Sequence, residues 1–586
     1  MSEIPGGAPS EATARLASET ARELPRRGRR WRDAGAGILL LLASSVFVLV
    51  ATEVAFRIRG TGEPQQWYLP AQGGAAAGQI ETIRYETTPR MPLRIAPARF
   101  AARKAPDALR VFLLGDSTVY GYPYGPKGTP SRVLEILLSQ SLPGRRIEVI
   151  NAGFLGADSS RALALLAEIL AFEPDAVVVY VGHNEFLRYD EAHQADVHFG
   201  FNPRVRLAPS AAAFVALHES ALWRWACGTN LGLSARGWWL ARRTGQTLGR
   251  SGLVEGALRE ATFRSHRENL VDMARLCREK KIALVLCTIA GNARSQPPLL
   301  RRHGRVGAER LAAARRHIAA AEGALSSARA RDALEESRAA LTADSADAWA
   351  DWLAARALVA AGRTGEAAAA FEDALEKDGL RHRAFARVSE TIREVARQEK
   401  VPLADIRDLF ERNSPEGIVG EELIVDHVHP NLSGMVLLAR GIAGELQQAG
   451  VLAPWTGGAV PGASLTDTEG GAVPGASLTD TEVVARLGLD RAAQRDAMLR
   501  LGLSAAGQGN PRRAASLFHI AATLYDPDDP EGSLGPPFCR GVAALLQDDL
   551  PRARELLGEV RRRDPAWYAR MTGRFAQLRI AERVGN

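Results

Sequence analysis

Short apolar runs and helical patterns alternate along most of this chain of 586 residues. The runs with the length of strands are Val111–Leu114, Ile147–Ile150, Ala176–Val181 and Ile282–Thr288, with a fifth strand expected near Val401–Leu403. Apolar residues recur at helical spacing in Ser131–Leu138, Ser160–Leu170, Glu268–Glu279 and Met435–Leu446. Strands that alternate with helices predict an α/β fold in which helices cover both faces of a parallel sheet.

One apolar run near the N-terminus is much longer than a strand. Ala34 to Thr52 carries no charge, which suits a helix that crosses a bilayer and needs ~20 apolar residues. An arginine cluster precedes it (Arg26, Arg27, Arg29, Arg30 and Arg32), and basic residues stay on the cytoplasmic side. A cleaved signal peptide is the alternative, but Glu53 and Phe56 stand where small residues would favour cleavage. The pattern favours a single-pass anchor in the inner (plasma) membrane, with the following residues on the periplasmic or extracellular side.

Two alanine-rich helical regions, residues 305–381 and 484–586, interrupt and follow the alternating pattern. Small and aromatic residues recur in both at spacings that resemble tetratricopeptide repeats: Gly362, Ala367, Phe371, Ala374, Ala514, Phe518, Ala521, Ala553, Leu557, Val560 and Pro565. Such repeats stack on their neighbours and often bind a protein partner. Simple helical hairpins that bind nothing would produce the same pattern, so both interpretations stay open.

Two further segments stand outside the α/β pattern. Residues 189–256 hold Trp223, Trp225, Trp238 and Trp239 among arginines, as expected of a helical lid or of a segment that lies on a membrane surface. Gly457–Glu469 reads GGAVPGASLTDTE and is repeated without change in Gly470–Glu482. This composition predicts a flexible linker. We therefore expect that deletion of Val484–Asn586 would leave chemistry in the α/β part nearly intact.

Charge and cysteine content exclude several classes of protein. Much of the net charge of +7 comes from the N-terminal arginine cluster, so it does not indicate nucleic-acid binding. The four cysteines, Cys227, Cys277, Cys287 and Cys539, are too widely spaced for a metal or redox motif. Cys277 and Cys287 are expected to be buried thiols. No metal or organic cofactor is expected.

Four short blocks carry the candidate chemistry, and each follows a predicted strand or lies in a loop. They are Gly115-Asp116-Ser117, Asn151-Ala152-Gly153-Phe154-Leu155-Gly156, Gly182-His183-Asn184-Glu185 and Asp426-His427-Val428-His429-Pro430. Ser117 comes shortly after an apolar strand, where ligands collect in open α/β sheets. Asp426 lies three residues before His429, a spacing that places both side chains on one face of a helical turn. A serine becomes a nucleophile when such a base takes its proton.

In this order the blocks resemble the signature of the SGNH hydrolases, also called the GDSL esterase/lipase family. The resemblance implies a three-layer α/β/α, flavodoxin-like sheet. It implies that Ser117 is the nucleophile, that His429 is the base and that Asp426 orients it. It also assigns three oxyanion donors: the backbone N–H groups of Ser117 and Gly156 and the side-chain amide of Asn184.

The match to this family has departures. Thr118 stands where the family name has leucine, and Glu185 follows Asn184 where aspartate is usual, which leaves the contacts of that loop uncertain. There is no Gly-x-Ser-x-Gly motif at Ser117, which argues against the α/β-hydrolase class. His427 is adjacent to Asp426 and is expected to point elsewhere.

These observations predict eight segments. They are a basic tail (1–33), an anchor (34–56), an irregular juxtamembrane segment (57–106), a hydrolase domain in two parts (107–304 and 382–450) around a helical insertion (305–381), a linker (451–483) and a C-terminal helical domain (484–586). The expected function is that of a membrane-anchored serine esterase or O-acyltransferase that acts on esters or acylated carbohydrate, such as O-acetyl groups of cell-envelope polysaccharide. The alternatives are a lipase or lysophospholipase, and a catalytically silent repeat scaffold.

Overall fold

A computed structural model of the chain describes residues 39–56, 58–59, 68–70, 79–82, 95–186, 222, 256–455, 478–507, 510–526, 528 and 531–584. The arginine cluster, the four tryptophans of residues 189–256, Cys227 and most of the duplicated linker lie outside the described residues. The predictions made for those segments remain predictions.

A five-stranded parallel sheet in the order β5-β4-β6-β7-β8 forms the centre of the fold. Its strands are β4 (Ala108–Gly115), β5 (Arg146–Gly153), β6 (Ala176–Tyr180), β7 (Ala283–Cys287) and β8 (Leu403–Ala404). Every residue of β4 and β6 is buried, as expected for strands covered on both faces. All five predicted strands are confirmed. The chain runs from β4 to β5 on one side and then crosses to β6 on the other, so β4 lies at the topological switch point.

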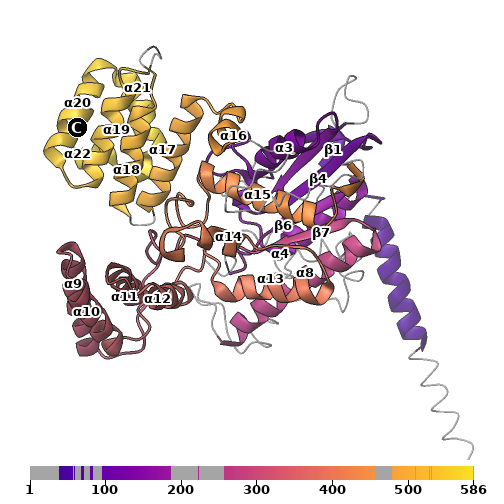
Figure 1. Cartoon of the computed structure of the whole chain (residues 1–586), viewed down its shortest axis with the longest axis horizontal. Coiled ribbons are helices and arrows are strands. Elements are labelled where there is room, and N and C mark those ends of the chain that lie inside the picture. Colours follow the sequence, from indigo (N-terminus) through magenta and orange to yellow (C-terminus); the bar gives the residue numbers. More distant parts are fainter. Residues whose placement is uncertain are drawn as a thin grey trace, which may run out of the picture.

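Helices cover both faces of this sheet and complete three layers (Figure 1). Helix α3 (Pro130–Ser141) packs with α15 (Leu432–Gln448) on one face, and α8 (Gly256–Glu279) packs with α4 (Ser159–Ile169) and α13 (Ala386–Glu399) on the other. The helices predicted from periodicity are confirmed: three of them differ from the predicted bounds by one to three residues at each end, whereas α8 begins 12 residues before the predicted Glu268. Cys277 of α8 and Cys287 of β7 are buried, so burial raises the pKa of the Cys277 thiol to about 12.

The segment before β4 is more ordered than the sequence pattern indicates. Three short strands, β1 (Tyr68–Pro70), β2 (Gln79–Thr82) and β3 (Arg99–Ala101), form an antiparallel sheet within the segment predicted to be irregular. Tyr68 is buried, and its ring meets those of Phe100, Phe112 and Phe172 edge to face at 5.5–6.4 Å. This aromatic cluster joins the segment to β4, because Phe112 belongs to that strand.

Both helical regions consist of consecutive antiparallel hairpins. The insertion holds α9 (Ala308–Ser326), α10 (Ala330–Ala343), α11 (Ala348–Ala360) and α12 (Thr364–Lys377). After α16 (Asp480–Arg486), the C-terminal region holds α17 (Arg491–Gly507), α18 (Pro511–Thr523), α19 (Gly535–Leu546), α20 (Leu550–Arg563), α21 (Pro565–Arg574) and α22 (Ile580–Val584). The end of the second linker copy caps α16, where Thr479 and Glu482 exchange hydrogen bonds in a capping box.

Residues Leu39–Phe56 form a helix that is long and apolar enough to cross a membrane. Its leucine and valine side chains are exposed in the described structure. The hydroxyls of Ser44, Ser45 and Thr52 donate to carbonyls one turn back, so these polar groups are satisfied within the helix. The helix lies at the end of the hydrolase domain opposite the two helical regions (Figure 1).

Gly153, at the end of β5, provides a test of how closely the serine-bearing turn packs on the sheet. A Cβ built on Gly153 would lie 2.1 Å from the backbone nitrogen of Tyr120, which belongs to the turn after β4. Gly153→Ala should therefore destabilise the hydrolase domain by about 1–3 kcal/mol, since backbone cannot move aside as a side chain can. Gly307→Ala is the matched control, because nothing lies within 4 Å of its added Cβ. Equal thermal midpoints for the two variants would contradict this packing.

Candidate active site

Ser117 lies where β4 ends and the short helix α2 (Ser117–Tyr120) begins. Asp116 caps this helix by accepting a hydrogen bond from the Thr118 N–H at 2.9 Å. Gly115 pairs with Gly153 of β5 and with Tyr180 of β6. The serine is therefore presented at the switch point of the sheet, the position at which open α/β folds bind ligands.

His429 and Asp426 meet Ser117 in one hydrogen-bonded chain. The Nε2 atom of His429 lies 2.8 Å from the Ser117 Oγ, and its Nδ1 lies 2.6 Å from Asp426 Oδ2. The other Asp426 oxygen accepts the backbone N–H groups of Val428 and His429 at 2.9 and 2.8 Å. These bonds hold the carboxylate behind the imidazole, so the free nitrogen of the ring faces the serine.

The charge on Asp426 is favoured despite its burial. Burial alone would raise its pKa, but the adjacent His429 and His427 imidazoles and the hydrogen bonds from His429 lower the pKa well below the ordinary range. A carboxylate that stays ionised can stabilise the positive imidazole that forms when the serine loses its proton.

His427 occupies a different position. Its Nδ1 lies 3.7 Å from Asp426 Oδ1, outside hydrogen-bond distance, and its ring centre lies 5.8 Å from that of His429. Burial lowers the pKa of His427 to about 4, although Asp426 opposes this. Its backbone carbonyl accepts the Asn292 N–H at 3.0 Å. His427 thus supports the loop, whereas His429 contacts the serine.

The two other predicted donor residues follow the neighbouring strands. Gly156 comes after β5 and adopts a left-handed conformation with φ of +70°, which glycine tolerates best. Asn184 comes after β6, is buried, and donates one amide hydrogen to the Ala157 carbonyl at 3.0 Å. A primary amide has two donor hydrogens. The hydrogen bond to Ala157 fixes the orientation of the Asn184 amide and uses one of its two hydrogens.

A family model for the GDSL-like lipase/acylhydrolase family matches residues 113–358. Residues 113–358 therefore carry a domain of this family. The match includes Ser117, Gly156 and Asn184 and ends before Asp426 and His429, which the fold brings back to the serine from the far side of the helical insertion.

Among solved structures, the chain is similar to an acetyl-xylooligosaccharide esterase from Geobacillus stearothermophilus, with 12% identity over 58% of this chain and 94% of that one (TM-score 0.27). It is also similar to a lipase/acylhydrolase from Enterococcus faecalis, with 15% identity over 58% of this chain and 96% of that one (TM-score 0.26). No curated protein sequence matches the chain significantly.

Glu185, one of the departures from the family pattern, is part of a buried polar network. Its two carboxylate oxygens accept the backbone N–H and the hydroxyl of Ser159, at 2.7 and 2.8 Å. Asn269 donates to the hydroxyls of Ser159 and Ser160. The network ties the Asn184 loop of the hydrolase to the start of α4. Sequence reasoning missed it, because Ser159 and Asn269 belong to no motif and meet only in the folded chain.

Tyr122 is a second residue that the motifs do not identify. Its ring lies 4.5 Å from that of His429, centre to centre, at an angle of 51°. Burial raises the pKa of Tyr122 to about 12, so the phenol stays neutral beside the imidazole. The only sequence signal is its position five residues after Ser117, in the turn that the serine opens.

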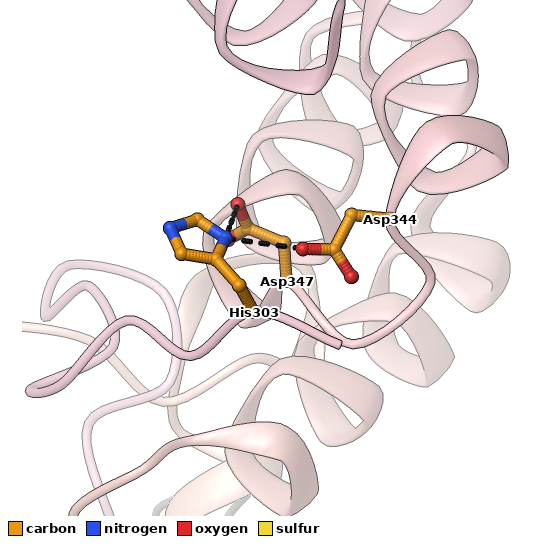
Figure 2. Close-up of side chains that lie close together, drawn as sticks. All are labelled: His303, Asp344 and Asp347. Atoms are coloured by element: carbon orange, nitrogen blue, oxygen red, sulfur yellow. Dashed lines mark hydrogen bonds and ion pairs between the residues drawn. The ribbon is translucent and has the colours of Figure 1, made fainter. Parts of the chain in front are cut away.

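A cluster of potential metal ligands among the described residues lies where the chain enters the helical insertion, and there His303 meets Asp344 and Asp347 (Figure 2). His303 Nδ1 lies 3.0 Å from Asp344. Asp344 also accepts the Gly304 N–H, and Asp347 caps α11 and pairs with Arg301 at 2.6 Å. These contacts already supply hydrogen-bond and ion-pair partners to both carboxylates. We therefore interpret the cluster as a structural contact that holds the loop at 301–304 against the turn before α11.

Asp116 gives the site a testable pH dependence. Burial raises its pKa to about 6, although the Thr118 N–H opposes this. Asp116 therefore binds its proton more tightly in the folded state than in the unfolded state, and the bound proton stabilises the fold. This stabilisation is lost as pH rises from about 4 to about 6. A shift of about two units corresponds to ~3 kcal/mol. In denaturant melts, Asp116→Asn should gain stability relative to wild type by up to that amount across this window. A difference that does not vary with pH would rule out the buried, protonated carboxyl.

Proposed function

We propose that the protein is a membrane-anchored, extracytoplasmic serine esterase or O-acyltransferase that works through an acyl-serine intermediate. The observation that carries the proposal is the continuous chain from Asp426 through His429 to the Ser117 hydroxyl, with bonds of 2.6 and 2.8 Å. The contact between His429 and Ser117 is short enough for proton transfer to and from the serine without rearrangement, and the contact with Asp426 holds the imidazole in place for that transfer.

In the proposed reaction, His429 Nε2 takes the proton of Ser117 while Oγ bonds to the ester carbonyl carbon. The tetrahedral intermediate collapses when the bond to the leaving alcohol breaks and His429 returns the proton to that alcohol. Water or a sugar hydroxyl then attacks the acyl-serine, again losing its proton to His429, and the serine is released with its proton restored. Asp426 stabilises the imidazolium in both halves.

Three donors would hold the negative charge on the substrate oxygen: the backbone N–H groups of Ser117 and Gly156 and the second amide hydrogen of Asn184. One such donor contributes ~3 kcal/mol to lowering the barrier. The buried contact of Asn184 with Ala157 supports this role, because an amide that is already oriented loses little freedom when the oxyanion forms.

We further propose that the acyl group comes from an O-acetylated polysaccharide of the cell envelope. The turns that carry Ser117 and His429 contact the C-terminal helices, which lie at the end of the molecule away from the Leu39–Phe56 helix (Figure 1). A site at this end favours a polymer outside the membrane. The apolar helix alone favours the alternative, a lipase or lysophospholipase, whose substrate would be a long acyl chain in the bilayer. A silent scaffold would not need an intact hydrogen-bonded chain at the serine.

The first test compares the two histidines. Ser117→Ala and His429→Ala should lower turnover of a short acetyl ester by on the order of 10⁴–10⁶, and Ser117→Ala should abolish labelling by a fluorophosphonate probe. His427→Ala should be mild, and Asn184→Ala should cost about 10²–10³. Hydrolysis of long acyl esters in preference to acetyl esters would favour the lipase alternative. Full activity in a folded His429→Ala variant would overturn the mechanism.

The second test addresses sidedness. Because arginines precede the apolar helix and none lies within it, residues after Arg57 should face outward. Protease added to cells with a permeabilised outer layer should digest the hydrolase domain, while a cytoplasmic marker protein stays intact. Resistance of the domain until the inner membrane is lysed would place it in the cytoplasm.

A further inference from the structure

The turn that follows the candidate nucleophile is held by the C-terminal helices. Arg500 of α17 donates from Nε and Nη2 to the Pro123 carbonyl, at 3.1 and 2.6 Å. Lys127 of the same turn donates to the Gly488 carbonyl at 3.1 Å. Tyr124 is buried in an apolar cluster with Met435 of α15 and Ala497 of α17. The two hydrogen-bonded pairs join residues 361 and 377 positions apart, so they form only when the chain folds and do not depend on the linker.

The loop that carries Asp426 and His429 is held by the same helices. Arg513 of α18 pairs with Glu421 at 2.7 Å and donates weakly to the Val425 carbonyl at 3.4 Å. Val425 is buried in the apolar core of the C-terminal region, and its N–H donates to the His429 carbonyl at 2.8 Å. Val425, the residue directly before Asp426, is thus buried in the core of the C-terminal domain, although in sequence it belongs to the hydrolase domain.

Tyr122 lies between these two attachments. Tyr122 packs against the C-terminal apolar core and lies near Ser504 of α17. Its ring meets the His429 imidazole at 4.5 Å. A displacement of α17 would therefore move Tyr122, the Pro123 carbonyl and Val425 together. Tyr122 contacts His429, Val425 directly precedes Asp426, and Pro123 lies in the turn that begins at Ser117.

We propose that the C-terminal helical domain positions the catalytic residues, with Tyr122 as the positioning residue and with Arg500 and Arg513 as its anchors. This inference rests on the proposed function of Ser117 and His429. It reverses the expectation that residues 484–586 could be deleted without effect on the chemistry. A partner that binds this domain and loosens α17 would lower activity without touching the substrate.

The test uses the full-length protein with both anchors changed to glutamine, Arg500→Gln with Arg513→Gln. The kcat for a short acetyl ester should fall about 10–100-fold, because a displacement of ~1 Å at the reacting groups costs about that much. KM should change far less, and the pH profile of kcat should move, since Tyr122 no longer holds the imidazole. Arg513→Lys should retain most of the activity, because it keeps the ion pair with Glu421.

Two controls separate positioning from folding. Arg552→Gln removes an arginine of the same domain that pairs with Glu555 within α20, and it should leave kcat and the pH profile unchanged. Tyr122→Phe keeps the ring on His429 and should be mild, whereas Tyr122→Ala should reproduce the double anchor variant. Wild-type kcat and pH profile in a folded double anchor variant would overturn the proposal.

Hydrogen exchange gives a readout that does not depend on activity. In the double anchor variant, amides of residues 121–128 and 419–430 should exchange faster, whereas Arg552→Gln should match wild type. If wild type cleaves no ester but both loops respond, the proposed function fails and the positioning contact stands. If wild type is active and the loops and kcat do not respond, positioning fails and the proposed function stands. Faster exchange with unchanged kcat would also refute positioning.

Discussion

The hydrogen bond between Ser117 and His429 joins residues 312 positions apart, and the rest of the fold keeps that distance short. Ser117 is fixed by the fully buried strand β4. His429 is fixed by its own loop, in which Val425 and Asn431 donate to the His429 and Leu423 carbonyls and Asn292 donates to the His427 carbonyl. These backbone bonds matter because an error of ~1 Å between nucleophile and base costs about 10²-fold in rate.

The helical insertion separates Ser117 from His429 in the sequence, yet its length does not disturb the geometry of the site. Buried Asp378 accepts the N–H groups of Leu299 and Leu300, where the chain enters the insertion, and pairs with Arg383, where the chain leaves it. Arg383 also donates to the carbonyls of Asn292 and Gln296. These contacts hold the two ends of the insertion close together, so the insertion connects to the α/β part as a short loop would. The entropic cost of closing such a loop grows only slowly with the number of residues in it.

The sequence allowed prediction of those parts of the fold that depend on local pattern. Buried parallel strands leave continuous apolar runs, and the four blocks identify Ser117, Gly156, Asn184, Asp426 and His429 without any knowledge of the fold. The small antiparallel sheet was missed because its strands are only three or four residues long, which is too short for a period of two to stand out in the sequence. The attachment of the C-terminal domain was missed for a different reason. Arg500 and Arg513 resemble any surface arginine until their acceptors are known: the Pro123 carbonyl for Arg500, and the Glu421 carboxylate and Val425 carbonyl for Arg513.

The duplicated linker illustrates why covalent connection was a poor guide to this attachment. Doubling the length of a flexible connection costs only ~0.6 kcal/mol of closure entropy. A hydrogen bond from a charged group contributes ~1.5–3 kcal/mol, and Arg500 alone makes two to the Pro123 carbonyl. The free energy of these contacts is therefore larger than the entropic cost of a longer linker. The C-terminal domain should keep its position whether one copy of the repeat or two precedes it. Under the positioning proposed above, a change in linker length leaves the site unaltered, whereas a change in the residues that contact Tyr122 or Val425 reaches His429.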